Sequence, residues 1–96
     1  MVVLVCYDVA TATPAGAKRL RTIADICEDH GIRVQYSVFE CRLTPATWVL
    51  FRARLLRKFD PTEDSLRFYF LDRDAMARTE HHGAKTALDP TKPLIV

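Results

Sequence analysis

The sequence predicts a single α+β domain in which two helices cover one face of an antiparallel sheet. Three observations indicate this class. The pairs Thr13-Pro14 and Thr44-Pro45 each open a helical pattern, and β-rich segments precede, separate and follow the two helices. The chain of 96 residues suits one domain rather than two, and its hydrophobic content of 49% is sufficient for a core.

The first predicted element is a strand over residues 2–7, an apolar run that ends at Asp8. We interpret this run as a buried strand with a site at its end, because ligands gather at the carboxyl ends of strands in open α/β sheets. The alternative is that the Asp8 side chain caps the turn that follows.

The first helix begins with Thr13 as its N-cap. Its apolar stripe has the i, i+3, i+4, i+7 spacing and consists of Leu20, Ile23, Ala24 and Cys27. We expect Gly31 to end the helix in the left-handed conformation. Lys18, Arg19 and Arg21 lie near the positive end of the helix dipole, and a role in gripping phosphate would explain this small cost in stability.

Residues 32–43 are rich in β-forming residues, but two alternating phases slip near Val38 and Phe39. A slip of phase predicts a bulge, a bend or a very tight hairpin. No turn-forming pair such as Asn-Gly marks the position, so the turn stays unassigned.

The second helix runs from Pro45 to about Phe59 and ends before Pro61. Its predicted buried stripe consists of Trp48, Phe51, Leu55 and Phe59. A further strand covers residues 65–72, and its alternation points one set of side chains to one side, namely Leu66, Phe68 and Phe70.

This order of elements is that of a ferredoxin-like βαββαβ sandwich. We assign residues 1–72 to this core and residues 73–96 to a polar connection that ends in a short extra C-terminal strand, Leu94-Ile95-Val96. Apolar residues at a terminus are seldom left in water, so this strand either closes the chain's own sheet or adds to the sheet of a partner. Exchange of the strand with a second copy is our hypothesis.

Several classes of protein are excluded. The longest apolar run is much shorter than the roughly 20 residues that span a bilayer, and the start of the sequence has no basic leader with a cleavage signal. We therefore expect a soluble, cytoplasmic protein without a membrane partner. Cys6, Cys27 and Cys41 are too widely spaced for a zinc ribbon or a redox pair, and we interpret them as reduced core thiols.

Basic residues gather between positions 33 and 58. The only acid in this segment is Glu40, and its six basic residues are Arg33, Arg42, Arg52, Arg54, Arg57 and Lys58. A basic face favours an anionic partner such as nucleic acid. A merely solvated helix face is the alternative.

An acid at a strand end with such bases nearby suggests metal-assisted cleavage of a phosphodiester. Mg²⁺ commonly takes one or two carboxylates, waters and substrate phosphate, but no second acid near Asp8 in the sequence supplies another ligand. A twofold dimer with Asp8 near its axis would present two carboxylates that share one ion. Arg19, Arg21 and Arg33 could then hold the scissile and flanking phosphates.

Other candidate sites are weaker. Adjacent His81 and His82 are geometrically awkward for a common metal and favour a solvated loop. Ser37 has no base partner in the sequence. Residues 67–70, RFYF, are faintly similar to a strand that stacks RNA bases, but alternate aromatic residues usually form core.

Three segments together resemble one family. Val5-Cys6-Tyr7-Asp8-Val9, Arg19-Leu20-Arg21 and residues 31–41, GIRVQYSVFEC, are similar to the CRISPR-associated adaptation proteins of the Cas2 family, a family described as metal-dependent endoribonucleases. The match spans most of residues 1–72, and RVQYSVFE is its most specific part.

The resemblance implies a ferredoxin-like homodimer whose C-terminal strand crosses to the partner. It implies a catalytic Mg²⁺ (or Mn²⁺) site at Asp8 and assembly with a larger integrase subunit that inserts spacer DNA into the CRISPR array. The positions that it implies as support for the site are Tyr7, Arg19, Arg21, Arg33 and Phe39.

Two functions therefore compete. The first is a homodimeric, Mg²⁺-dependent endonuclease that acts in spacer acquisition on single-stranded RNA or duplex DNA. The second is a non-catalytic dimer that bridges integrase subunits and binds DNA through its basic face, with Arg52, Arg54 and Arg57. Only the first needs the Asp8 carboxylate. A module for a small anion or an acidic peptide is a third possibility, which the resemblance disfavours.

Overall fold

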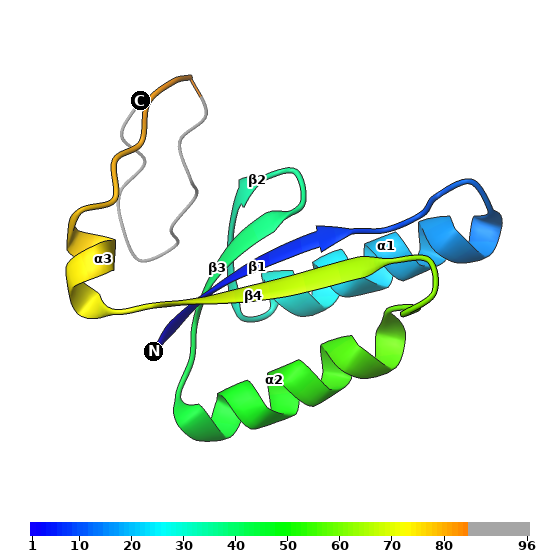
Figure 1. The fold of residues 1–96 in the computed structure, drawn as a ribbon, viewed down its shortest axis with the longest axis horizontal. Helices are drawn as coiled ribbons and strands as arrows, with labels where there is room; N and C mark the ends of the chain where they lie inside the picture. Colours follow the sequence, from blue (N-terminus) through cyan, green and yellow to red (C-terminus); the bar gives the residue numbers. More distant parts are fainter. Residues whose placement is uncertain (85–96) are drawn as a thin grey trace.

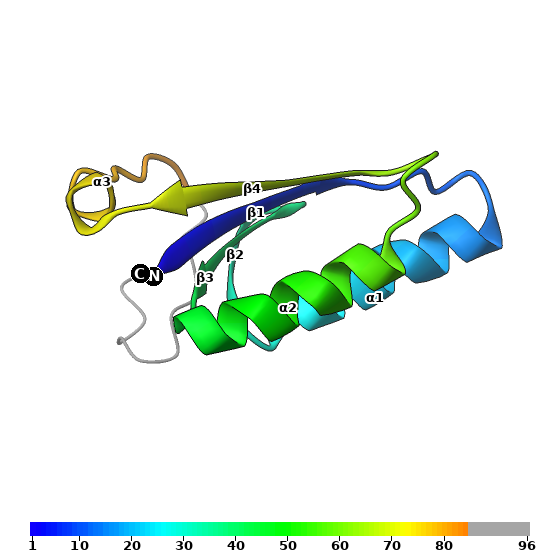
Figure 2. The same ribbon diagram turned by 60° about the horizontal axis from the view of Figure 1, so that its bottom comes forward.

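The computed structural model describes residues 1–84, which form a two-layer α+β sandwich (Figure 1). The elements in chain order are β1 (Val2–Asp8), α1 (Pro14–Glu28), β2 (Gly31–Gln35), β3 (Val38–Arg42), α2 (Pro45–Lys58), β4 (Ser65–Leu71) and α3 (Arg73–Ala77). The described strands form one antiparallel sheet in the order β2-β3-β1-β4. Figure 2 shows α1 and α2 together on one side of this sheet, which confirms the ferredoxin-like fold.

β1 is buried on one face only, which corrects the expectation of a fully buried strand. Val3, Val5 and Tyr7 face the helices and are buried, whereas Leu4 and Cys6 are half-buried on the opposite side. The pleat sends alternate side chains to opposite faces, and neither α1 nor α2 covers the second face. We call this second face of the sheet, which carries Leu4, Cys6, Asp8, Val38 and Glu40, the open face.

The helices bury the predicted stripes, because their caps and apolar spacing agree. The Oγ1 atoms of Thr13 and Thr44 accept hydrogen bonds from the amides of Gly16 and Thr47, each at 3.1 Å, as expected of N-caps. The core combines Val3, Val5, Tyr7, Phe39 and Cys41 of the sheet with Ile23, Ala24 and Cys27 of α1 and Phe51 and Leu55 of α2, against which Leu20, Trp48, Phe59, Leu66 and Phe68 pack.

The β2–β3 segment contains both a tight hairpin and an irregular register. The turn consists of Tyr36 and Ser37, and the pairing shifts between Arg33 and Gln35. Both features lie a few residues before Val38, where the slip of phase was predicted. The pairing of β3 with β1 places Phe39 and Cys41 on the helix side and Val38 on the open face, so the apolar residues of β3 lie on both faces.

Gly31 is the first residue of β2 rather than a left-handed helix cap, so that prediction was wrong. α1 ends at Glu28, and its C-cap Asp29 has an ordinary right-handed φ of −65°. A Cβ atom on Gly31 would lie 2.3 Å from the Glu40 carbonyl oxygen and 2.6 Å from Cys41 Sγ. Glycine is therefore needed here because β3 approaches closely.

The segment after β4 contains a short helix that the sequence did not predict. Asp72 caps α3 by accepting a hydrogen bond from the Ala75 amide at 2.7 Å. None of its five residues is buried, so the sequence has no apolar stripe here from which the helix could be predicted. The expected C-terminal strand over residues 94–96 lies outside the described residues. Among residues 1–84, every helix is too short or too polar to span a bilayer.

Leu55→Ala should lower the free energy of unfolding by about 2–5 kcal/mol, because it opens a cavity at a side chain that is fully buried in the core. The matched control on the same helix is Leu50→Ala, which removes a side chain that is 68% exposed and should change the free energy by less than about 0.5 kcal/mol. Urea denaturation at one protein concentration measures both. Equal losses would contradict the placement of the α2 stripe.

Candidate functional site

Asp8 lies at the end of β1, where the backbone is fixed from both sides. Its register partner on β4 is Ser65, and on the other side the Tyr7 amide donates to the Ser37 carbonyl at 3.1 Å. The Asp8 side chain is exposed and, among residues 1–84, forms neither a salt bridge nor a hydrogen bond. It does not cap the following turn, because the Ala10 amide donates to Asp64 instead. A free carboxylate on a rigid strand end is suited to bind a cation.

A metal site at Asp8 would be incomplete in one chain. Within the described residues, no three His, Cys, Asp or Glu side chains come together as a ligand set. Carboxylate oxygens are ligands that Mg²⁺ prefers, and Mg²⁺ usually keeps several waters. Asp8 therefore fits a magnesium ion as one ligand, provided that a second copy or the substrate supplies others.

The expected supporting residues Tyr7 and Phe39 lie on the helix side of the sheet, opposite the Asp8 side chain. Their rings stack with centroids 6.3 Å apart, and the Arg33 guanidinium lies 5.0 Å from the centroid of Phe39. Burial raises the pKa of Tyr7, an effect that the Arg33 guanidinium opposes. Arg33 also approaches Glu28 at 3.6 Å. These residues therefore pack against the end of β1 from the helix side of the sheet, on the face opposite the Asp8 side chain.

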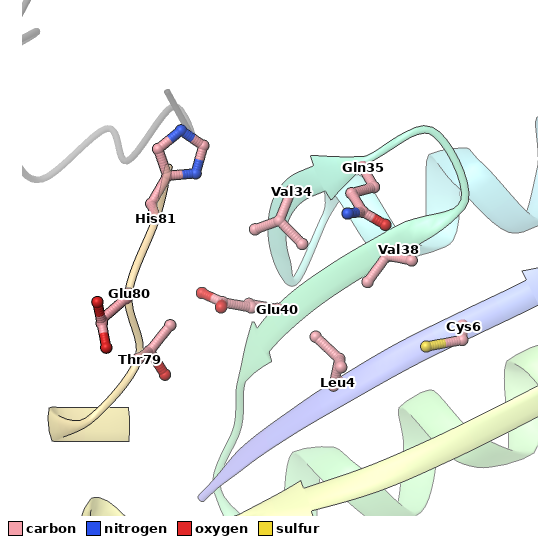
Figure 3. A pocket seen from close by; sticks show the side chains of 9 residues that line it. All are labelled: Leu4, Cys6, Val34, Gln35, Val38, Glu40, Thr79, Glu80 and His81. Carbon is pink, nitrogen blue, oxygen red and sulfur yellow. The ribbon is translucent and has the colours of Figure 1, made fainter. Parts of the chain in front are cut away.

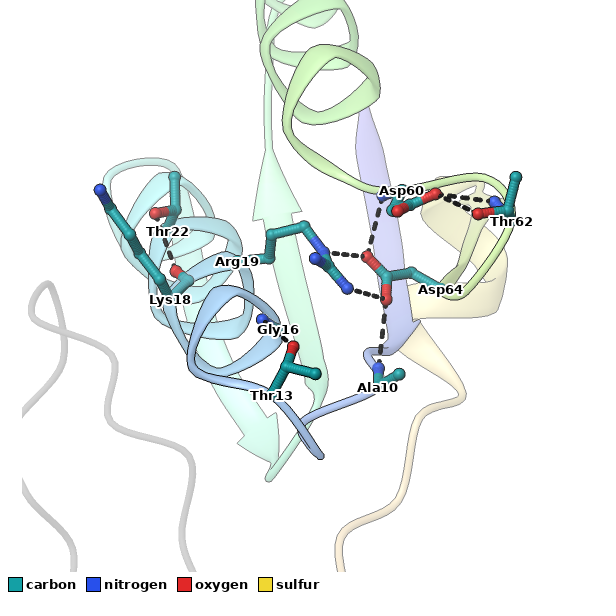
Figure 4. A network of polar contacts seen from close by, with 9 residues as sticks. All are labelled: Ala10, Thr13, Gly16, Lys18, Arg19, Thr22, Asp60, Thr62 and Asp64. Atoms are coloured by element: carbon teal, nitrogen blue, oxygen red, sulfur yellow. Dashed lines mark hydrogen bonds and ion pairs between the residues drawn. The ribbon is translucent and has the colours of Figure 1, made fainter.

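Arg19 has a partner within the fold rather than a free guanidinium. Its Nε atom donates to Asp64 Oδ2 at 2.9 Å and its Nη2 atom to Oδ1 at 3.2 Å (Figure 4). The same carboxylate accepts hydrogen bonds from the Ala10 amide at 3.1 Å and the Asp60 amide at 2.9 Å. We call this set of contacts the Asp64 clamp. The clamp explains why Arg19 stands near the start of α1, and it does so without a role for Arg19 in binding phosphate.

The basic residues of α2 gather at a groove on the helix layer. Arg54, Arg57 and Lys58 line it together with Thr22 and Ile26 of α1, and its volume is about 370 Å³. Arg21 and Arg52 are likewise exposed, and none of these basic side chains forms a salt bridge in the part of the chain that the structure describes. Three of the six basic residues named for the predicted face, Arg54, Arg57 and Lys58, thus line one groove, which lies on the helix layer rather than on the open face.

The open face carries a shallow hollow that the sequence reasoning missed. Its volume is about 570 Å³, and Leu4, Cys6, Val38 and Glu40 line its floor, while residues 79–81 border it (Figure 3). The run of six apolar residues in β1 concealed the hollow because both faces of that strand are apolar. The sequence signal at this place is limited to Glu40, an acid between the apolar residues Phe39 and Cys41.

Two further residues near Asp8 were also missed. Asp64 stands directly before β4 and anchors the loop that follows Asp8, and Tyr36 at the hairpin tip is 84% exposed. Asp64 has no marked sequence context, and Tyr36, although it lies within RVQYSVFE, is not distinguished there as a site residue. Only the antiparallel register, which pairs Asp8 with Ser65 and Cys6 with Val38, brings both segments to the end of β1.

Comparison with known proteins gives consistent matches. Residues 1–79 match the sequence model of a family described as CRISPR associated protein Cas2. The CRISPR-associated endoribonuclease Cas2 of Chlorobaculum tepidum is 55% identical over 96 residues, with 100% of both chains covered. The CRISPR-associated endonuclease Cas2 of Halalkalibacterium halodurans is 42% identical over 95 residues, which cover 99% of each chain. The crystal structure of Streptococcus pyogenes Cas2 at pH 6.5 superposes with a TM-score of 0.77 and 53% identity, covering 86% of this chain and 100% of that one.

The Asp64 clamp predicts a specific loss of stability in acid. Its hydrogen bonds from Arg19 hold the pKa of the Asp64 carboxyl at about 2, below the value of about 3.9 for an unfolded Asp. Because the folded value is the lower one, the stabilisation is complete above about pH 5 and is lost as the pH falls through about 4 towards about 2. Urea denaturation measures the free energy of unfolding at pH values between about 5 and about 2. Over this range the free energy should fall less for Asp64→Asn than for the wild type.

The control for this experiment is Asp74→Asn, which removes the exposed ion pair between Asp74 and Arg78 at 3.3 Å. In this variant the free energy of unfolding should depend on pH as steeply as in the wild type, because an exposed ion pair contributes little to stability. An unchanged acid dependence in Asp64→Asn would show that Asp64 titrates alike in the folded and unfolded chains.

Proposed function

This chain belongs to the CRISPR-associated Cas2 family, and we propose that it acts in spacer acquisition as a homodimeric, Mg²⁺-dependent endonuclease. The observation that carries the proposal is the Asp8 carboxylate, which is exposed, without an ion-pair partner among residues 1–84, and fixed on a rigid strand end. Relatives with 55% and 42% identity are named endoribonuclease and endonuclease, respectively. The proposed substrate is single-stranded RNA, with duplex DNA as the alternative.

The proposed dimer uses the open face. Leu4, Cys6 and Val38 present apolar atoms there that neither long helix covers. A second copy packed on this face would bury them and bring a second Asp8 towards the first, which answers the lack of a second carboxylate in one chain. Glu40 would need a cationic partner in such an interface, and the exposed Arg67 of β4 has suitable charge.

Each set of residues then has a separate task. Paired Asp8 side chains hold the divalent ion, which would polarise the phosphodiester and lower the pKa of a bound water. Arg21 and the groove with Arg54 and Arg57 bind phosphates farther along the nucleic acid. Tyr7, Arg33 and Phe39 keep the end of β1 rigid, because their packing fixes the strand from the helix side.

The second candidate is the architectural dimer that binds duplex DNA and an integrase subunit without cleavage. The observation that favours it is the separation of the basic groove on the helix layer from Asp8 on the open face. Binding of DNA along the helix layer would not require the carboxylate at all.

Asp8→Asn separates the two functions, because it preserves the shape of the side chain and removes its charge. Under the nuclease proposal we expect cleavage to fall by at least about 100-fold, since a metal ligand is lost. Nucleic-acid affinity and the mass of the assembly should stay unchanged. The assay should compare Mg²⁺, Mn²⁺ and chelator on both RNA and DNA. Cleavage by Asp8→Asn at the wild-type rate would sink the proposal, whereas full spacer acquisition by an inactive variant would favour the architectural dimer.

Cys6 offers a direct probe of the proposed dimer. Burial raises the pKa of Cys27 and Cys41 to about 12, so both are protonated and inaccessible at pH values near 8. Cys6 is half-buried on the open face, so a thiol reagent should modify it in the monomer and leave it unmodified at concentrations where the dimer forms. Mass spectrometry measures the labelling, and Cys6→Ser identifies the labelled site. A labelling rate that does not change with dimer formation would place the interface elsewhere.

A further inference from the structure

We propose that Asp64 is a positioning residue for the Asp8 carboxylate, and that Arg19 acts through Asp64 rather than on a phosphate of the substrate. The inference deepens the proposed function and depends on it for the role of Asp8. It assigns the two residues that lie 45 positions apart in the chain to one structural unit beside the site.

The geometry of the Asp64 clamp carries the first half of this inference. Ser65 of β4 pairs with Asp8 of β1. Asp64, the residue before Ser65, accepts a hydrogen bond from the Ala10 amide at 3.1 Å. Two consecutive residues, Asp64 and Ser65, therefore hold the backbone from Asp8 to Ala10 in place. Gly16 packs against the same loop so closely that a Cβ atom would meet the Ala10 carbonyl. The end of β1 is thus fixed where it would otherwise fray into a loop.

The state of the Asp64 side chain shows why the clamp needs Arg19. The side chain of Asp64 is inaccessible to solvent, whereas that of Arg19 is 22% exposed. An ionised carboxylate in such a place requires a charged partner as well as hydrogen bonds. Arg19 meets this need through two parallel hydrogen bonds, a geometry that lysine cannot reproduce.

These contacts also argue against Arg19 as a phosphate ligand. To reach a phosphate, its guanidinium would have to release both bonds and leave the Asp64 carboxylate without its charged partner, which is a large cost for an inaccessible group. Arg21, two residues farther along α1, is exposed and has no such tie among the described residues. The same helix therefore carries one basic residue for the fold and another that is free for an anion.

The test uses Arg19→Lys, Arg19→Gln and Asp64→Asn, the double variant Arg19→Lys/Asp64→Asn, and Arg78→Lys as the control. The control alters an exposed ion pair outside the site. The variants are compared at a temperature where circular dichroism shows each to be folded, and Arg19→Lys preserves the charge if Asp64→Asn does not fold. The first readout is amide hydrogen exchange at Ala10 and the NMR shift of the Asp8 carboxyl carbon, neither of which requires cleavage or metal.

We expect Arg19→Lys and Asp64→Asn each to accelerate exchange at Ala10, to move the Asp8 signal, and to raise the Mg²⁺ concentration for half-maximal cleavage by about 10-fold or more. The double variant should be no worse than the more severe single variant, because both single changes break the same unit. Arg78→Lys should match the wild type in each measurement.

The salt dependence of nucleic-acid affinity separates the two roles of arginine. Arg57→Gln should lower the slope of log affinity against log salt by about one, whereas Arg19→Gln should leave it unchanged. A slope lowered by Arg19→Gln, together with an unmoved Asp8 signal in Asp64→Asn, would overturn the inference. If Asp8→Asn cleaves normally, the proposed function fails, but the Asp8 signal still reports whether the clamp positions that carboxylate.

Discussion

The alternation of side chains along β1 is the constraint on which the rest of the molecule depends. β1 is hydrogen-bonded to β3 on one side and to β4 on the other, and the helices cover only one face of the sheet. Val3, Val5 and Tyr7 must therefore build the core, and the residues between them must face outwards. A shift of one residue in the register would bury Asp8 and expose the core, so the fold and the site are set by the same pairing.

The one-sided sheet also divides the molecule into two surfaces with different chemistry. The open face combines apolar side chains with the exposed carboxylate of Asp8, whereas the helix layer carries the groove with Arg54, Arg57 and Lys58. Tyr7 and Phe39 belong to neither surface, because they pack between the sheet and the helices. The apolar open face and the basic groove thus lie on opposite sides of one small domain.

Local features of the fold could be predicted from the sequence because their causes lie within a few residues. The Thr-Pro helix starts, the stripes of α1 and α2 and the alternation of β4 are of this kind. Gly31 was misread because its close approach to Glu40 depends on a strand that comes later in the chain. Asp8 could be singled out by its place at the end of an apolar run, but the partner of Arg19 could not, because 45 residues separate Arg19 from Asp64 and no periodicity links them.

The Asp64 clamp also limits how this sequence can diverge. Arg19 and Asp64 form one ion pair, in which the Asp64 carboxylate is inaccessible to solvent. The amides of Ala10 and Asp60 also require an acceptor at position 64, whatever residue stands at position 19. A lineage that exchanges the Arg–Asp pair for a neutral one must pass through an intermediate in which either a charge or two amides lack a partner. The two positions should therefore co-vary among descendants of this chain, whereas the exposed arginines of α2 can change without affecting this pair.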